Sequence, residues 1–226
     1  MSEAWIHNFS GRADDASSGY FDERLTIGSS VSDPMQSSRK ITARRAPPPT
    51  GIAGWPTVLG LVAGIAAGFS SELPAIVMVC AAIYVVAAVA GRPNAAWIGF
   101  LASIPFVGIG RMLDQPWVSL AAIGSATLIL IVVGVARGVW RARENRRQLF
   151  AMALFSAIAV AAAAGVDPII AGILVIVGLL GHAAWDIWHH LRTAVVARSY
   201  AEFCAVLDVI LAIVVAVTLV VDAVAR

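Results

Sequence analysis

Three of the four histidines in this chain lie within one short, otherwise apolar stretch. His182, His189 and His190 share that stretch with a single carboxylate, Asp186. At about 100° per residue, these four side chains fall within roughly one 100° arc of a helix. Imidazole and carboxylate groups one or two turns apart can bind zinc, iron or manganese, and they can also relay protons. The stretch is therefore the first candidate for a functional site.

A second polar stripe lies in the last apolar segment. Tyr200, Cys204 and Asp208 are spaced i, i+4 and i+8, so they share one helical face. The two segments are joined by residues 191–200, which makes them antiparallel neighbours. If the stripes meet, His182 and Asp208 lie at similar depth, roughly 12 Å inside their helix ends.

These two stripes predict a tentative metal site within a wider polar cluster. The predicted ligands are His182, Asp186, His190 and Asp208, and the surrounding polar residues are His189, Tyr200 and Cys204. The sequence leaves the cofactor unknown, with a divalent transition metal as the candidate. Ionisable groups at membrane depth are costly and therefore suggest function. The structural alternative is that Asp186 pairs with a histidine or with Arg192, and that His189 and His190 mark the end of the span.

The segment Asp186–His190 also resembles the His-x-x-His-His box of membrane desaturases and hydroxylases, with Asp in the first place. The resemblance covers five residues. Those enzymes carry several such boxes, whereas this chain holds four histidines in all, so the sequence does not predict membership of that family.

Composition places these helices in a membrane. Hydrophobic residues make up 59% of the chain, charged residues 13%, and the mean hydropathy is +0.83. Soluble domains are about a quarter charged, so the chain resembles polytopic membrane proteins in composition. The net charge of +2 gives no reason to expect a nucleic-acid partner. The lipid bilayer is the first expected partner.

The chain divides into two parts. Residues 1–50 are polar and end in three prolines, and they predict a disordered cytoplasmic tail because they lack the apolar content to offset ordering. No signal-peptide-like apolar region lies near the start. Residues 51–226 predict a transmembrane helix bundle.

Seven apolar segments predict an all-α, polytopic membrane bundle of about seven transmembrane helices. The segments are 54–71, 74–90, 95–110, 116–138, 148–165, 168–190 and 201–223. A helix needs about 20 residues to cross the hydrocarbon core. The fourth, sixth and seventh segments reach that length, whereas the others depend on their flanks.

The arginines predict the orientation of the bundle. Loops on the tail's side carry eight arginines, against Arg111 and Arg226 on the other side. By the positive-inside rule, this predicts a cytoplasmic N-terminus and an extracytoplasmic C-terminus. Fifteen arginines against one lysine, with much Ala and Val, suggest a bacterial origin and hence the bacterial plasma membrane. The inner segment 137–147 is interpreted as a loop that sets topology.

A stripe of glycines in the first segment predicts close helix packing. Gly60, Gly64 and Gly68 recur every four residues, which lets another backbone approach. The stripe can serve packing within the bundle or a homo-oligomer, and the sequence favours the bundle.

The sequence leaves the function open among three hypotheses. No Walker loop, Rossmann fingerprint, zincin motif or nucleophile elbow is present. The leading interpretation is an accessory or partner-binding membrane component, with a membrane-protein partner or a second copy as candidates. The alternatives are a metal-dependent intramembrane enzyme that uses the His/Asp cluster, and a proton-coupled small-molecule transporter.

Overall fold

The computed structural model describes residues 54–165, 167–192 and 195–225. The predicted tail, residues 1–50, lies outside the described residues. Every regular element in the described part of the chain is helical. The elements are α1 (Trp55–Ala67), α2 (Leu73–Ala90), α3 (Ala95–Met112), α4 (Pro116–Ala136), the 3₁₀ turn η2 (Val139–Arg141), α5 (Arg143–Ala164), α6 (Pro168–Arg192) and α7 (Arg198–Val224).

Six of these helices are long and apolar enough to cross a membrane, and the predicted all-α multi-pass fold is confirmed. The seventh, α1, has 13 residues. Its length is about 20 Å, less than the ~30 Å hydrocarbon core, because Gly68 to Ser71 turn the chain toward α2. The protein is thus a multi-pass membrane protein, and its described residues form six helices of spanning length and one short apolar helix.

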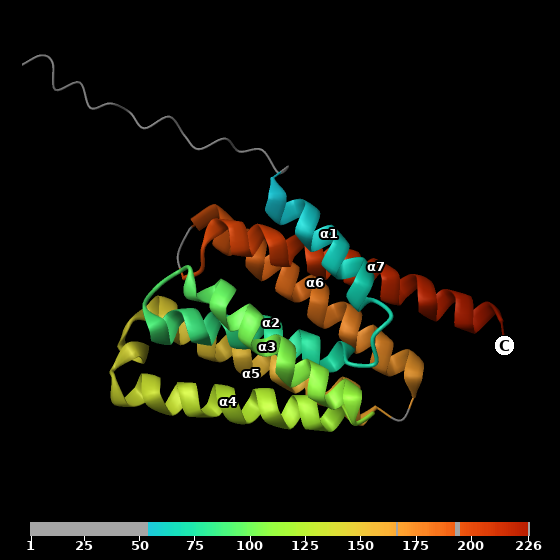
Figure 1. Ribbon diagram of the computed structural model, residues 1–226, viewed down its shortest axis with the longest axis horizontal. Helices are drawn as coiled ribbons and strands as arrows, with labels where there is room; N and C mark the ends of the chain where they lie inside the picture. The colour runs from blue at the N-terminus through green and yellow to red at the C-terminus, as the bar shows by residue number, and fades with distance from the viewer. Residues whose placement is uncertain (1–53, 166, 193–194, 226) are drawn as a thin grey trace, which may run out of the picture. The chain divides into compact units, whose positions relative to one another are not determined.

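Helix α2 is the centre of the bundle (Figure 1). It packs against α3, α4, α5 and α6, and most of its residues are buried. Its sequence is apolar on every side, which is the pattern of a helix surrounded by other helices. Cys80 and Tyr84 are the only side chains in α2 with a polar hydrogen, and they lie four residues apart. Both therefore face the same direction inside the bundle.

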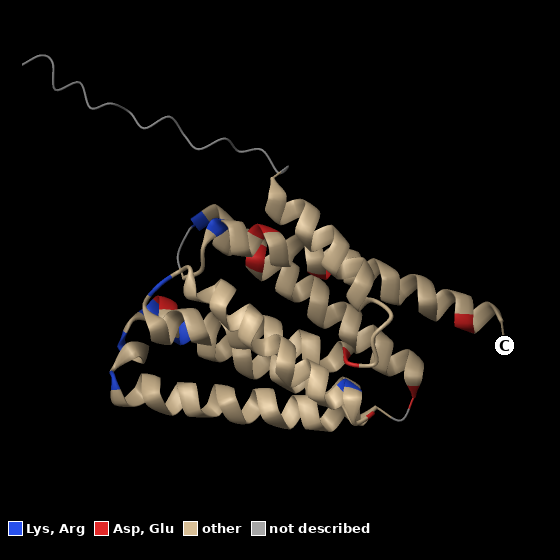
Figure 2. Ribbon diagram, viewed as in Figure 1, with Lys and Arg blue, Asp and Glu red and all other residues tan. Residues whose placement is uncertain are grey.

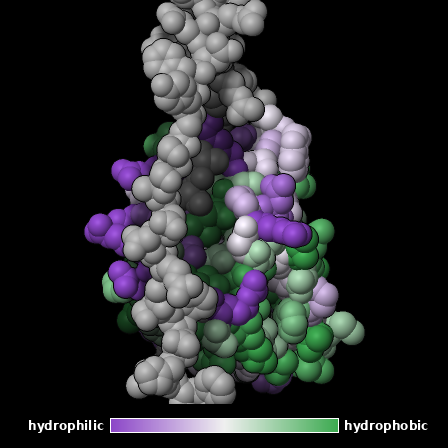
Figure 3. All heavy atoms as spheres, turned by 90° about the vertical axis from the view of Figure 1, so that its left-hand side faces the viewer, coloured by the Kyte–Doolittle hydropathy of each residue, from purple (hydrophilic) through white to green (hydrophobic). Residues whose placement is uncertain are grey.

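Apart from Asp186 and Asp208, which lie inside the bundle, the described charged residues gather at its two ends (Figure 2). One end, named here the arginine-rich end, carries Arg92, Arg137, Arg141, Arg143, Arg146, Arg147, Arg192 and Arg198. Hydrophilic side chains gather there when this end faces the viewer (Figure 3). The opposite end, named the acidic end, carries Glu72, Asp114, Asp167 and Asp222, with Arg111 as its single described basic residue. The long apolar faces between the two ends match a membrane-spanning layer.

The arginine-rich segment is only partly a loop. Val139–Arg141 form the turn η2, and α5 already begins at Arg143, five residues before the predicted start of that span. Arg147 pairs with Glu144 at 2.9 Å within the first turns of α5. Polar side chains can extend a helix beyond the hydrocarbon layer, and hydropathy alone does not show where such a helix begins.

The glycine stripe of α1 lies against α7. A methyl group on Gly60 would come within 2.5 Å of the Phe203 carbonyl oxygen, and one on Gly64 within 2.9 Å of the Leu207 carbonyl oxygen. A methyl group on Gly68 would meet Val214 at 2.4 Å. The stripe thus serves contact inside this chain, where two backbones approach more closely than any larger side chain permits.

We predict that Gly64→Leu destabilises the bundle by about 1–3 kcal/mol, because the new side chain has no space against α7. The matched control is Ala66→Leu, which adds a larger side chain to an exposed position of the same helix. Thermal unfolding of the detergent-purified proteins measures the stability of both variants. Equal midpoints for the two variants would contradict the packing described here.

Candidate metal centre

Helices α6 and α7 bring His182 and Asp208 together in the bundle core. The two helices are antiparallel neighbours, and each of these residues lies ten positions from the arginine-rich end of its helix, about 15 Å along the axis. The His182 Nδ1 atom lies 2.8 Å from Asp208 Oδ2, and both side chains are fully buried. The pairing expected from the two polar stripes is present.

A second carboxylate extends this pair toward α2. Asp186 lies one turn after His182, and its Oδ2 atom is 3.0 Å from His182 Nδ1. That nitrogen carries at most one proton, and Asp208 is nearer, so Asp186 Oδ2 makes an ionic contact and has no hydrogen bond of its own. Tyr84 of α2 donates its hydroxyl proton to Asp186 Oδ1.

Cys80 of α2 adds a thiol to the other carboxylate. Its sulfur lies 3.5 Å from Asp208 Oδ1, at a hydrogen-bonding distance for a thiol donor. The network therefore joins Tyr84, Asp186, His182, Asp208 and Cys80 through three hydrogen bonds and one ionic contact, the one between Asp186 and His182. All five side chains are buried and come from three different helices.

Three members of this network form a compact set of metal-type donors. One ligand atom from each of Cys80, His182 and Asp208 lies within 4.8 Å of the others. Zinc binds thiolate at about 2.3 Å and imidazole or carboxylate at about 2.0–2.2 Å, so donor atoms around one ion lie roughly 3–4 Å apart. The contacts of 2.8 and 3.5 Å are close to that spacing. The two contacts reach different oxygens of Asp208 and each holds a hydrogen, so an ion bound here would take the place of those hydrogens.

Two buried polar atoms of the network lack a hydrogen-bond partner among the described residues. They are His182 Nε2 and Asp186 Oδ2. A buried polar atom without a partner costs about 1–3 kcal/mol, so such atoms mark places where a ligand or water completes the structure. Here both belong to the residues that surround the candidate metal position.

The remaining histidines of α6 lie outside this donor set. The Nδ1 atom of His190, one of the predicted ligands, lies 3.2 Å from the Arg198 carbonyl oxygen at the arginine-rich end. His189 is buried, and its Nδ1 atom lies 3.0 Å from the carbonyl oxygen of Trp185, one turn earlier in α6. Gln148 of α5 lies 3.1 Å from His189 Nε2. The structure thus separates His190 from His182, Asp186 and Asp208, and gives both distal histidines protein partners.

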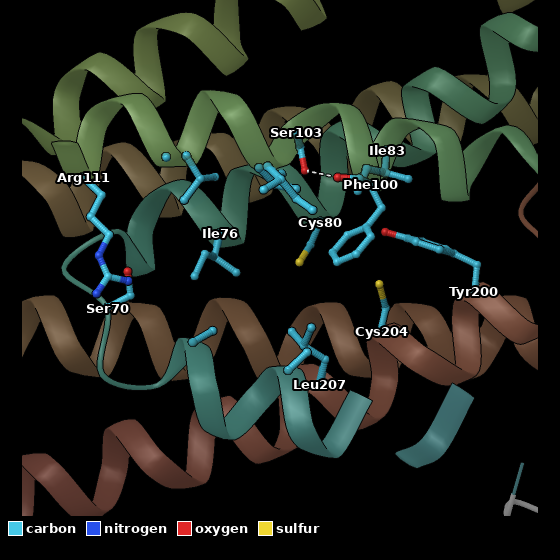
Figure 4. Close-up of a pocket in the computed structure, with 16 residues that line it drawn as sticks. Ser70, Ile76, Cys80, Ile83, Phe100, Ser103, Arg111, Tyr200, Cys204 and Leu207 are labelled. Atoms are coloured by element: carbon cyan, nitrogen blue, oxygen red, sulfur yellow. Dashed lines mark hydrogen bonds between the residues drawn. The ribbon is translucent and has the colours of Figure 1, made fainter. Parts of the chain in front are cut away.

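Tyr200 and Cys204, predicted as further members of the polar cluster, line a cavity beside the network (Figure 4). The cavity has a volume of about 280 Å³ and lies between α1, α2, α3 and α7. Cys80 also lines it, so one thiol belongs to both the cavity and the network. Cys204 is free and buried, and it is not a member of the compact donor set.

Two residues of the network, Cys80 and Tyr84, were not among the predicted site residues. The sequence signal that could have identified them is their i, i+4 spacing in a helix that has no other side chain with a polar hydrogen.

Comparison of this chain with protein-family models, curated proteins and solved structures finds no match. The argument for function therefore depends on the residues of the site themselves.

We predict that His182→Ala lowers the free energy of unfolding by about 3–5 kcal/mol, because it leaves two buried carboxylates without their shared partner. His190→Ala is the control, since its side chain is only half-buried and bonds to a backbone carbonyl. Denaturant titration in detergent compares the two variants. A His182→Ala protein as stable as His190→Ala would show that the network contributes little to folding.

Proposed function

We propose that this membrane protein binds a divalent transition metal through Cys80, His182 and Asp208 and acts as a metal-dependent intramembrane enzyme. The observation that carries the proposal is the convergence of a thiol, an imidazole and a carboxylate from three helices at one buried point. Zinc is the metal best suited to this donor set, because it binds sulfur, nitrogen and oxygen ligands equally well.

The number of donors favours catalysis over a purely structural role. Structural zinc sites have four protein ligands, whereas catalytic sites have three and leave a position for water or substrate. Asp186 is suited to a supporting role, because it contacts His182 and is itself oriented by the Tyr84 hydroxyl. Such hydrogen-bonded carboxylates fix the orientation of metal-binding histidines.

This proposal differs from the interpretation that the sequence favoured. An accessory or partner-binding role stays a prediction, since no described feature tests it. The addition of Cys80 to the histidine and aspartate is what favours the metal alternative, because a thiol is a common zinc ligand and a rare proton carrier.

Proton-coupled transport is a second candidate, supported by the buried cluster of Asp186, His182 and Asp208, whose three side chains are in contact. A chain of Asp and His side chains inside a bundle can pass protons between its ends. The two candidates make opposite statements about metal content, so a single measurement separates them.

We predict that the protein purified in detergent after zinc loading holds about one zinc ion per chain. Cys80→Ser and Asp208→Asn should each lose most of the metal, because each removes one of three ligands. Cys204→Ser is the matched control: it removes the chain's other thiol from the same region without touching the donor set. Elemental analysis after exhaustive dialysis measures the stoichiometry.

Cobalt substitution gives an independent readout, because a thiolate bound to Co²⁺ produces a sulfur-to-metal charge-transfer band. The band should appear in wild type and Cys204→Ser and be absent in Cys80→Ser. Metal-free wild-type protein after loading, or equal metal in the two cysteine variants, would exclude this site and leave the proton-coupled candidate.

We further propose that the chain lies in a bacterial plasma membrane with the arginine-rich end in the cytoplasm. Eight described arginines at that end against Arg111 at the other support this orientation. The N-terminus would then be cytoplasmic, and the end of α7 would be extracytoplasmic. The candidate metal centre would lie near the middle of the bilayer.

Reporter fusions after residue 226 test the orientation. We expect alkaline phosphatase to be active there and green fluorescent protein to be dark, because α7 ends at the acidic end. The opposite pair of activities would reverse the proposed topology.

A further inference from the structure

The cavity beside the network is elongated along the helices. Its wall on α3 extends from Phe100 to Arg111, a rise of about 16 Å. Most of the wall is apolar, with isoleucine, valine and alanine side chains from α1, α2 and α3. Its volume of about 280 Å³ lies near the lower end of pockets that hold small molecules, ~300–1000 Å³.

One end of the cavity holds a buried hydroxyl without a partner. Tyr200 is fully buried, and its hydroxyl oxygen makes no hydrogen bond of ordinary geometry to any described residue, its near neighbour being the weakly bonding thiol of Cys204. The hydroxyl points into the cavity toward Phe100 (Figure 4). Because a buried hydroxyl without a partner is costly, this position is suited to an oxygen atom supplied by a ligand.

The other end of the cavity holds a positive charge. Arg111 lies there beside Ser70 (Figure 4). Glu72 and Asp114 belong to the same end of the bundle, yet no described carboxylate pairs with Arg111. Arginine binds carboxylates through charge-assisted hydrogen bonds, so its guanidinium is suited to an anionic group of a ligand.

From these two ends we infer that the cavity binds a single-chain amphipathic carboxylate: its acid group on Arg111, its apolar chain along α3, and an oxygen at its far end on the Tyr200 hydroxyl. As the substrate site of a metal-dependent enzyme, the cavity depends on the proposed function, since Cys80 connects the two. Binding of the carboxylate ligand to the cavity does not itself need the metal.

The test uses three ten-carbon probes and the full chain in lipid nanodiscs. ω-Hydroxydecanoate has both polar ends, decanoate lacks the far oxygen, and 1,10-decanediol lacks the charge. Equilibrium binding of each radiolabelled probe is measured, and uptake by protein-free nanodiscs is subtracted.

Two variants address the two ends separately. Tyr200→Phe should weaken the binding of ω-hydroxydecanoate about two- to tenfold and leave the binding of decanoate unchanged, because the variant cannot make the hydrogen bond to the far oxygen. Its thermal unfolding should match wild type closely, since the hydroxyl makes no hydrogen bond of ordinary geometry within the described part of the protein. Arg111→Gln should weaken the binding of both carboxylates about tenfold and leave the binding of the diol unchanged. Arg141→Gln, an exposed change at the other end of the bundle, is the control.

A third variant closes the cavity. Gly108 lines it, and a methyl group on Gly108 would meet no atom within 4 Å, so Gly108→Phe adds a large side chain at a point of the wall where its first carbon has open space. Binding of all three probes should fall in this variant. Asp208→Asn, which does not line the cavity, should retain binding even where it loses the metal.

Binding that Tyr200→Phe and Arg111→Gln leave unchanged, or uptake no greater than in protein-free nanodiscs, would overturn the inference. A protein that binds the probes but no metal would overturn the proposed function and keep the cavity as a ligand site. A protein that binds zinc but none of the probes would overturn the ligand site in the cavity and keep the metal site.

Discussion

The structure depends on one constraint: His182 and Asp208 are buried where neither lipid nor the surrounding apolar side chains can solvate them. A charged side chain at the centre of a membrane helix costs about 2.5–3.5 kcal/mol even on insertion scales, so these groups are stable only when they face each other. Their contact fixes the rotation and register of α6 against α7. Cys80 and Tyr84 of the central helix then donate one hydrogen bond each to Asp208 and Asp186, which ties α2 to the same point.

The other helices hold this arrangement in place. Helix α1 is short, yet its glycines place its backbone directly on α7, between Phe203 and Val214, on both sides of Asp208 in the sequence. On the opposite side, α5 contributes Phe155, whose ring packs edge-on against His182 at 5.1 Å between centroids. The space left between α1, α2, α3 and α7 is the apolar cavity, and Cys80 is the residue through which that cavity borders the polar network. The polar network and the cavity are therefore two parts of one interior.

Much of this was predictable from sequence, and the rest has identifiable physical reasons. Composition and hydropathy predicted the all-α membrane fold, because apolar length alone decides which segments can cross a bilayer. Helical periodicity placed His182 and Asp208 on facing stripes. The same periodicity grouped His190 with them, but the stripe is about two turns long, and its last residue reaches the helix end, where Arg198 offers a carbonyl. Cys80 was missed because its contact joins residues 128 positions apart, and periodicity within one helix carries no information about a third helix. Whether the assembled residues hold a metal stays a prediction.

X-ray absorption spectroscopy of the zinc-loaded protein tests the central claim most directly, because it reports the atoms bound to the metal. We predict one sulfur per zinc at about 2.3 Å and nitrogen or oxygen ligands at about 2.0–2.2 Å, with the sulfur shell lost in Cys80→Ser and kept in Cys204→Ser. A zinc ion surrounded only by nitrogen and oxygen, or a sulfur shell that survives Cys80→Ser, would contradict a metal centre built from α2, α6 and α7.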